Sequence, residues 1–420
     1  MAFLYETIIA ISWQQIVMWL IGGILIYLAI KKEMEPTLLL PIGFGAILMN
    51  FPGVVSYICG NDACPFAAEN LKFTFTQYTN NELCQCGHEI VSSHFGIGEP
   101  LHTLYEAGIA NELFPLILFI GIGAMIDFGP LLSKPWLMLF GAAAQFGIFF
   151  TLCTAAMFFA PEEGDLVSKV AASISIIGAA DGPTSIVVAN TLLGGTSNAG
   201  YIGAIAVAAY SYMALVPIIQ PPVIKALTTK EERKIRMAYK PASVSKTTKI
   251  LFPIVISVVT CLFVPAAGSL IGFLMFGNLI RECGVLDSLS ETAQKVLANL
   301  ITIFLGITIA FQMSADKFLN LSTLLILGLG LIAFIVDTAG GVLFAKLVNV
   351  VLRLFKKAPI NPMIGAAGIS AFPMSGRIVH KMGLAEDPQN FLLMHSIGVN
   401  VSGQIASVIA GSLVLGFFIG

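Results

Sequence analysis

The stretch Gly178-Ala179-Ala180-Asp181-Gly182-Pro183-Thr184 decides the fold, because it places one carboxylate among small residues inside a long apolar region. From Val170 to Ile224, Asp181 is the single formally charged side chain. Glycine and proline interrupt helices, so this sequence predicts a broken helix. The freed backbone groups persist at membrane depth only when they face protein or a water-filled cavity, and the break therefore marks a site.

The composition places the whole chain in a membrane. Of its 420 residues, 57% are hydrophobic and 11% are charged, whereas soluble domains carry about 25% charged residues. So few charges cannot cover a soluble surface or neutralise the phosphates of a nucleic acid. A soluble enzyme, a disordered chain and a nucleic-acid-binding protein are therefore excluded, and we expect a polytopic, all-α integral membrane protein in a lipid bilayer.

Ten apolar runs of helix length follow one another along the chain. They lie at about 13–30, 37–50, 112–127, 136–160, 201–224, 250–267, 271–280, 296–313, 320–347 and 391–420. No basic residue precedes the first run, which favours a retained helix over a cleaved signal peptide. Two further stretches, 166–200 and 358–380, are interrupted by glycine, proline and polar residues. We interpret each as a re-entrant hairpin.

The two hairpins take part in a weak internal repeat. Ile177-Gly178-Ala179-Ala180 matches Ile364-Gly365-Ala366-Ala367. Three other short matches keep the same order in both halves: Ile42-Gly43-Phe44 with Ile271-Gly272-Phe273, Phe119-Ile120-Gly121-Ile122 with Phe304-Leu305-Gly306-Ile307, and Ile202-Gly203 with Ile397-Gly398. The first half is the longer one, and a polar insert at about 51–110 accounts for its extra residues.

The basic residues predict how the halves are oriented. Segment 225–249 carries eight basic side chains against two acidic ones, which predicts a cytoplasmic loop. With 166–200 and 358–380 re-entrant, each half has five crossings, and five is odd. The halves are therefore predicted to be inverted repeats, as in secondary transporters, with a site near the midplane. The predicted organisation is a first membrane repeat over 1–224, the basic loop and a second, inverted repeat over 250–420.

Asp181 is the group in the first hairpin that suits a cation. A carboxylate at membrane depth costs about 3 kcal/mol or more unless it is paired or binds an ion. Helix capping is the structural alternative, because Asp followed by Gly-Pro suits a helix start. A hard cation such as Na⁺ needs several oxygens, and the hydroxyls of Thr184 or Ser185 with unwound carbonyls would supply them. We therefore predict a sodium site at Asp181.

The second hairpin, from Asn361 to Arg377, contains no acidic residue. Asn361, Ser370 and Ser375 offer oxygen atoms, and Arg377 is the single formal charge. Arg377 is either a positive-inside anchor or a guanidinium that receives a carboxylate from the cytoplasm.

Other polar groups inside the apolar runs are less specific. Asp127 lies near the end of its run, where interfacial water explains a charge. Asp337 lies deeper, and both packing against Thr338 and a functional role remain open. Tyr210 and Tyr212 lie in an apolar helix, where a tyrosine commonly donates a hydrogen bond to a neighbour.

The polar insert contains a cluster of cysteines and histidines: Cys59, Cys64, Cys84, Cys86, His88 and His94. On an outer face, the four cysteines would allow two disulfides in any of three pairings. Zinc is the alternative, although the Cys-x4-Cys and Cys-x-Cys spacings are unusual for its ligands. A structural role is favoured, and the choice between disulfides and a metal stays open.

Three segments together carry a specific family pattern: Gly178 to Thr184, the Tyr-Ser-Tyr helix from Gly203 to Pro217, and the hairpin from Asn361 to Arg377. They resemble the β subunit of the sodium-translocating, biotin-dependent decarboxylases, the family of the oxaloacetate, methylmalonyl-CoA and glutaconyl-CoA enzymes. The resemblance spans nearly the whole chain outside the insert. It implies a multi-pass protein of the bacterial cytoplasmic (inner) membrane that decarboxylates carboxybiotin and couples this reaction to Na⁺ export.

The resemblance also implies site residues, cofactors and partners. The family's functional residues fall on Asp181, Asn361, Gly365 and Ser370 for sodium binding, and on Arg377, Tyr210 and Tyr212 for catalysis. The stretch between the aspartate and the tyrosines is about five residues longer here. The implied cofactors are Na⁺ and biotin carried on a partner. The implied partners are a biotin carrier protein or domain, a carboxyltransferase subunit and a small membrane-anchored subunit, and a homo-oligomer is compatible with them.

A different class of function fits part of the pattern. A sodium-coupled symporter or antiporter without an enzyme partner would explain the inverted repeat and Asp181 equally well. It would not explain why the second hairpin ends in Arg377 at the cytoplasmic side. The acyl substrate is not encoded here, because that choice belongs to another subunit.

Overall fold

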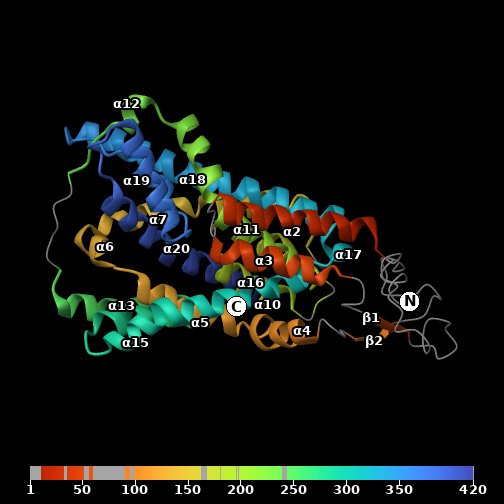
Figure 1. Cartoon of the computed structure of the whole chain (residues 1–420). Coiled ribbons are helices and arrows are strands. Elements are labelled where there is room, and N and C mark those ends of the chain that lie inside the picture. Colours follow the sequence, from red (N-terminus) through yellow and green to blue (C-terminus); the bar gives the residue numbers. More distant parts are fainter. Residues whose placement is uncertain are drawn as a thin grey trace. The chain divides into compact units, whose positions relative to one another are not determined.

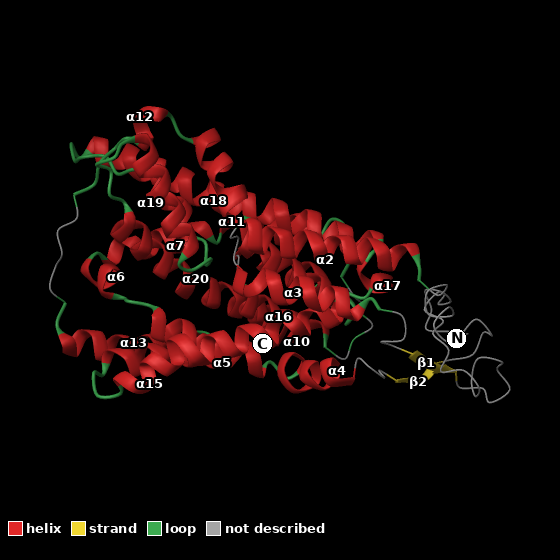
Figure 2. Ribbon diagram, viewed as in Figure 1, coloured by secondary structure: helices red, strands yellow, loops and turns green. Residues whose placement is uncertain are grey.

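The structure is a computed structural model that describes residues 11–32, 36–51, 56–59, 90–94, 99–161, 168–179, 181–194, 196, 198–238 and 244–419. These residues are helical almost throughout (Figures 1 and 2). Two short strands, β1 (Ser56–Cys59) and β2 (Ile90–His94), pair antiparallel in the polar insert. Cys64, Cys84, Cys86 and His88 lie outside the described residues, so the disulfide or metal role of the insert stays a prediction.

Each predicted apolar run is helical, and the run at 136–160 is divided at Gln145 between two α-helices. The longer helices are α2 (Trp13–Lys31), α3 (Pro36–Met49), α5 (Leu113–Met125), α8 (Phe146–Ala155), α11 (Tyr201–Leu227), α13 (Lys246–Phe263), α14 (Gly268–Glu282), α16 (Ala298–Ile309), α18 (Leu321–Leu354) and α20 (Leu393–Ile419). The shorter ones are α4 (Glu99–Tyr105), η2 (Glu106–Ala110), α6 (Gly129–Ser133), η3 (Pro135–Leu137), α7 (Met138–Ala144), α12 (Lys230–Arg233), η5 (Pro265–Ala267), α15 (Asp287–Glu291), η6 (Thr292–Leu297), η7 (Ala310–Gln312) and α17 (Ala315–Phe318). Within the described ranges, six helices can cross a membrane by length and composition, or up to eight if each bent pair is one span.

The chain forms two compact units. The first comprises residues 1–111 and 302–324, and the second comprises 112–301 and 325–420. These units group residues that pack together, and they do not test whether the two halves of the sequence are repeats. The predicted repeat boundaries at 224 and 250, and the inversion of the halves, therefore stay predictions.

In the first unit, α2 and α3 pack closely because two glycines face each other. A Cβ on Gly22 would lie 2.7 Å from the Gly43 carbonyl oxygen, and one on Gly43 would lie 2.8 Å from that of Gly22. At the end of α3, the Asn50 amide donates to the Met313 carbonyl over 2.8 Å and accepts from the Ala315 N–H over 2.8 Å. Small residues and polar side chains thus join these helices, as expected where lipid removes the hydrophobic drive for association.

In the second unit, α5 and α14 cross at an even closer distance. A Cβ on Gly123 would lie 1.9 Å from the Leu274 carbonyl oxygen, and one on Gly277 would lie 2.0 Å from that of Ile120. The Asn278 amide donates to the Ile126 carbonyl over 2.9 Å where α5 ends. The two backbones touch because neither glycine has a side chain.

The helix predicted as one crossing over 201–224 is bent. In α11 the axis turns by 65° between Met213 and Leu215. Pro217 lacks the N–H that would bond the Met213 carbonyl, and its ring crowds that carbonyl, so the helix bends there.

Both predicted breaks are present in the second unit. In the first hairpin, α9 (Lys169–Ser175) continues as η4 (Ile176–Ala179), and α10 (Gly182–Leu193) begins after the break. In the second, η8 (Pro362–Gly368) ends before α19 (Met374–Glu386) begins. Helix α20 packs against α7 and α19 (Figure 1), and it also contacts η8 and α10. The broken hairpins therefore share one central helix.

Candidate functional site

Asp181 lies at the first break and caps α10. Its backbone is extended, at φ −124° and ψ 96°, and its side chain accepts from the Thr184 N–H. The Thr184 hydroxyl donates to Oδ2 over 2.7 Å, and the side chain is 1% exposed. Gly182 and Pro183 follow as the first helical residues, where a missing N–H costs nothing. Asp181 thus caps α10, as the structural alternative predicted. Capping does not explain why a charged residue is buried at this position.

Hydroxyl groups from two helices lie around Asp181. The Ser407 hydroxyl on α20 donates to Oδ2 over 3.0 Å. The Ser185 hydroxyl donates to the Asp181 carbonyl over 2.8 Å. A hydroxyl can turn its lone pairs toward a cation, so carboxylate and hydroxyl oxygens from α10 and α20 suit a hard monovalent ion.

The two breaks meet beside Asp181. The Ser370 N–H donates to the Ala179 carbonyl over 3.0 Å, which joins the second break to the first. The Ser370 hydroxyl donates to the Gly403 carbonyl over 3.1 Å, and the Asn400 amide donates to the Ile369 carbonyl over 2.7 Å. The structure thus brings together the regions of Asp181 and Ser370, which lie far apart in the sequence.

Sequence reasoning missed the contribution of α20. Asn400, Gln404 and Ser407 are buried polar residues at positions i, i+4 and i+7, which lie on one face of a helix. All three reach the breaks: Asn400 donates to the Ile369 carbonyl, and the side chains of Gln404 and Ser407 form hydrogen bonds with Asp181. A polar stripe at helical spacing in an otherwise apolar run was the signal that could have identified them.

The two tyrosines of α11 point to different places. A Cβ on Gly182 would lie 2.4 Å from Cζ of Tyr210, so this ring covers the residue after Asp181. The Tyr210 hydroxyl is buried and has no hydrogen-bond partner among the described residues. The Tyr212 hydroxyl instead donates to the Leu327 carbonyl on α18. Residues two apart on a helix face different directions, and it is Tyr210 whose ring lies against Gly182, directly after Asp181.

Asn361 and Gly365 hold the second hairpin in place. The Asn361 side chain accepts from the Met363 N–H, and its amide donates to the Arg233 and Ile235 carbonyls over 2.9 and 3.0 Å. A Cβ on Gly365 would lie 2.0 Å from the Gly341 carbonyl oxygen, which shows direct backbone packing on α18. These contacts tie one end of η8 to the basic loop and its middle to α18.

Arg377 lies on the exposed side of α19. Within the described part of the chain its guanidinium forms no hydrogen bond or ion pair with another side chain, in contrast to Arg233 and Arg236. Its guanidinium is therefore available to an anion that approaches from outside the protein.

The basic loop is attached to the end of α19 by ion pairs. Arg233 donates to Glu386 over 2.7 Å, and Arg236 donates to Asp387 over 2.5 Å. The Arg233 guanidinium holds the pKa of Glu386 below its ordinary value, and Arg236 does the same for Asp387. These charge-assisted bonds fix the loop beside the second hairpin.

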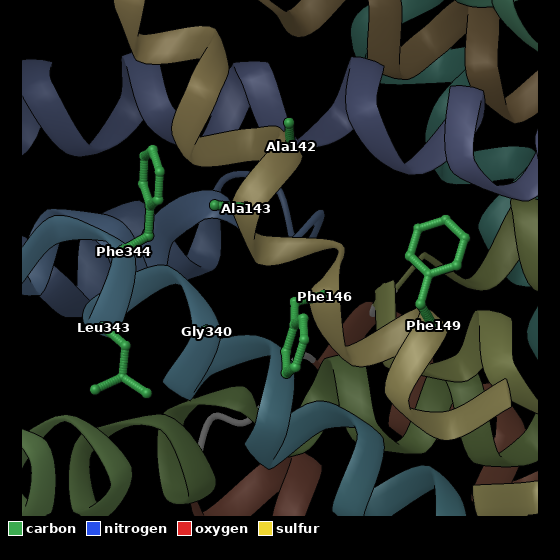
Figure 3. A pocket seen from close by; sticks show the side chains of 7 residues that line it. All are labelled: Ala142, Ala143, Phe146, Phe149, Gly340, Leu343 and Phe344. Carbon is green, nitrogen blue, oxygen red and sulfur yellow. The ribbon is translucent and has the colours of Figure 1, made fainter. Parts of the chain in front are cut away.

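The hollow shown in Figure 3 is a different feature. It has a volume of about 500 Å³ and is lined by Ala142, Ala143, Phe146, Phe149, Gly340, Leu343 and Phe344. The lining offers carbon rather than oxygen, so this hollow does not suit an ion. Within the described ranges, no three His, Cys, Asp or Glu side chains form a group that could hold a metal.

Comparison with known proteins gives consistent matches along the chain. A family model described as "Na+-transporting oxaloacetate decarboxylase beta subunit" matches residues 14–418. A probable oxaloacetate decarboxylase beta chain of Vibrio cholerae is 44% identical, over 98% of this chain and 96% of its own.

Two further relatives have different acyl substrates in their names. A methylmalonyl-CoA decarboxylase subunit beta of Propionigenium modestum and an oxaloacetate decarboxylase beta chain of Klebsiella pneumoniae are each 46% identical, over 96% of this chain and 94% of their own. Similar identity to both kinds of relative means that overall similarity does not select one acyl substrate.

Proposed function

Because the chain belongs to the family of Na⁺-transporting oxaloacetate decarboxylase β subunits, we propose that it decarboxylates carboxybiotin and exports Na⁺ across the membrane. It is a multi-pass membrane protein and one subunit of a multi-subunit sodium pump. The observation that carries the proposal is the buried carboxylate of Asp181 where the two breaks meet. The matched family and the relatives described above are all decarboxylase β subunits, so they do not favour the alternative of a sodium-coupled transporter without a decarboxylase partner.

In this proposal, sodium binds at Asp181 with the hydroxyls of Thr184, Ser185 and Ser407 as neutral ligands. One carboxylate and one Na⁺ form a neutral pair, which reduces the cost of charge at membrane depth. Ser370 links the second break to the site, so a shift of that hairpin would change the ligand geometry. Asn361 and Gly365 contribute by holding η8 in register.

Arg377 receives the carboxylate of the substrate in this proposal. Carboxybiotin, held on a partner, supplies a carboxylate that leaves as CO₂ and a nitrogen that must then take up a proton. A guanidinium forms paired, planar hydrogen bonds with a carboxylate, and Arg377 has no competing partner among the described residues. We assign proton movement at the Asp181 break to Tyr210, because its ring lies against Gly182 and its hydroxyl has no hydrogen-bond partner within the described chain.

The proposed partners follow from the same assignment. A biotin carrier protein or domain and a carboxyltransferase subunit would act at the cytoplasmic face, where Arg377 and the basic loop are expected. A small membrane-anchored subunit would complete the complex, and the bacterial cytoplasmic membrane is the proposed location.

Cysteine in place of Lys234 should then react only from the cytoplasm and cysteine in place of Glu163 only from outside. Reaction of both from one face would contradict the inverted halves.

The proposal is tested by Asp181→Asn in the assembled complex, reconstituted in liposomes. Sodium-dependent decarboxylation and ²²Na⁺ transport should be lost together, while the complex still co-purifies. Asp127→Asn is the matched control, because Asp127 lies 41% exposed beside Lys249 at 3.4 Å and outside the site. Near-normal sodium-stimulated turnover in Asp181→Asn would show that the ion binds elsewhere.

A further inference from the structure

A second buried carboxylate, Asp337 on α18, has no role in the proposed sodium site. Its side chain is 0% exposed. Neither Oδ1 nor Oδ2 has a hydrogen-bond partner of accepted geometry among the described residues, although the N–H groups of Gly147 and Ile148 face it. A buried carboxylate without a partner is costly as an anion, so this position calls for a cation or a proton.

The carboxylate of Asp337 lies against two glycines and the main chain of Ala333. A Cβ on Gly147 would lie 2.1 Å from Oδ1, and a Cβ on Gly178 would lie 3.5 Å from Oδ2. The Ala333 carbonyl oxygen would lie 2.8 Å from a Cβ on Gly147, and the Ala333 Cβ would lie 3.1 Å from one on Gly178. One turn further along α18, Gly340 lines the apolar hollow together with Phe146 (Figure 3). Among the described residues, therefore, no hydroxyl donates a hydrogen bond to this carboxylate, whereas the hydroxyls of Thr184 and Ser407 donate to Asp181.

The lack of hydroxyl contacts among the described residues distinguishes Asp337 from Asp181. Sodium needs several oxygens, and three hydroxyls lie around Asp181. Near Asp337 the Thr338 hydroxyl has no partner among the described residues, but it is the next residue and projects about 100° around the helix. A proton needs one covalent bond to oxygen and no ligand shell. We propose that Asp337 is a proton-binding site whose occupancy is coupled to sodium binding at the first break.

The segment η4 connects the two acids. Gly178 in η4 lies against Asp337, and Asp181 follows at the break where η4 ends. Two ionised carboxylates in a medium of low dielectric constant repel each other, so a positive charge on one weakens the binding of a positive charge to the other. Protonation of Asp337 should therefore weaken sodium binding, and sodium binding should release the proton.

Other ionisable groups on neighbouring elements define the controls. They are Tyr210 and Tyr212 on α11, Cys153 on α8, Lys169 at the start of α9, and Lys346 and Arg353 further along α18. Tyr212 donates to α18 at Leu327, and Cys153 is exposed. None of these contacts an Asp337 oxygen in any hydrogen bond or ion pair that the described residues form.

The test measures the half-saturating Na⁺ concentration for decarboxylation by the assembled complex, over the widest pH range in which it stays intact. In the wild type this concentration should rise as the pH falls, by about fivefold or more. Asp337→Asn is permanently neutral at this position, so it should resemble the protonated wild type. The variant should need more Na⁺ than the wild type at high pH, converge with it at low pH and show a flattened profile.

Thr338→Val is the matched control, because it alters an unpartnered side chain at the same depth without removing an ionisable group. It should keep the wild-type pH profile. An Asp337→Asn profile that follows the wild type would overturn the proposal, as would a Thr338→Val profile that flattens equally. If Asp337→Asn does not assemble, Asp337→Glu displaces the carboxyl group and should move the midpoint of the profile, and an unmoved midpoint would also overturn it.

A second readout needs no turnover. Adding Na⁺ to the purified wild-type complex in weakly buffered solution should release more protons than adding it to Asp337→Asn. Equal release would refute the coupling. The inference rests on the proposed sodium site, but different experiments test the two proposals. Asp181→Asn tests whether the Na⁺ response depends on the sodium site, whereas Asp337→Asn tests whether the pH dependence of that response depends on Asp337.

Discussion

The two broken hairpins match in sequence but hold opposite kinds of charge in opposite surroundings. The first places Asp181 in a buried position among hydroxyls. The second contains no acid, and its charge, Arg377, lies exposed. A buried anion selects a small cation that can shed its water, whereas an exposed guanidinium receives a large anion from solution. In the proposed function, the first break therefore serves transport and the second serves substrate capture.

The largest effect is expected from a glycine that both hairpins share by sequence. Gly365→Ala places a Cβ 2.0 Å from the Gly341 carbonyl oxygen, whereas Gly178→Ala, at the matching position, places one 3.1 Å from Ala333 Cβ. Backbone cannot yield as a side chain can, so Gly365→Ala should cost about 3 kcal/mol or more and Gly178→Ala clearly less. Thermal unfolding of the purified complex measures both. Equal losses would mean that the second hairpin is no more tightly packed than the first.

Arg377→Lys should reduce carboxybiotin decarboxylation at saturating Na⁺ by roughly a hundredfold, or about 3 kcal/mol of transition-state stabilisation. The ammonium keeps the charge but cannot form paired, planar hydrogen bonds. Lys381→Arg, one turn further along the same exposed side of α19, is the control and should leave the rate unchanged. A normal rate in Arg377→Lys would reduce Arg377 to a topological anchor and remove the contrast between the hairpins.

Asn361→Ala should lower the stability of the complex by about 1–3 kcal/mol. It removes the amide that donates to the Arg233 and Ile235 carbonyls, together with the oxygen that accepts from Met363. Asn361→Asp restores the accepting oxygen but not the donors, so it should recover part of the loss at most. If both variants retain wild-type stability but lose Na⁺ binding, Asn361 is a sodium ligand rather than a tether. Equilibrium ²²Na⁺ binding distinguishes these results.

The smallest effect concerns the ion pair between Arg233 and Glu386. The pKa of Glu386 is lowered in the folded protein by Arg233. Stability from this pair is therefore present above the carboxyl's unfolded pKa and is lost as the pH falls through the lower, folded value. Glu386→Gln should lower the melting temperature slightly at neutral pH and not at acid pH, measured against Glu291→Gln in the exposed pair with Lys295. A difference that persists at acid pH would point to packing instead of charge.

Much of the fold could be predicted because membrane insertion is read from local composition. The apolar runs, the two breaks and the capping of α10 by Asp181 depend on hydropathy and on the chemistry of Gly and Pro within a few residues. The bend in α11 was missed, although Pro217 is visible in the sequence, because proline within a membrane helix is often accommodated without a large bend.

The candidate site was less predictable, because several of its contacts join distant residues. Asp181 and Arg377 were identified by their charge, which is expensive or unusual at membrane depth. Ser407 was not identified, since a single serine in an apolar helix costs little free energy and has no charge to draw attention to it. The choice between Tyr210 and Tyr212 depends on the rotation of α11, which two equally polar side chains do not specify.

The sequence by itself determined that this chain is a polytopic, helical membrane protein with two broken hairpins and a single acid in the first. Each of these follows from the cost of charge and of unpaired backbone in hydrocarbon. Only the tertiary structure decided that Ala179 meets Ser370, that α20 supplies a hydroxyl to Asp181, and that Asp337 lies beside glycines with no hydrogen-bond partner among the described residues. Lipid is as apolar as most helix faces, so the hydropathy pattern favours no particular helix pairing, and close packing between glycines and a few buried polar groups makes the selection.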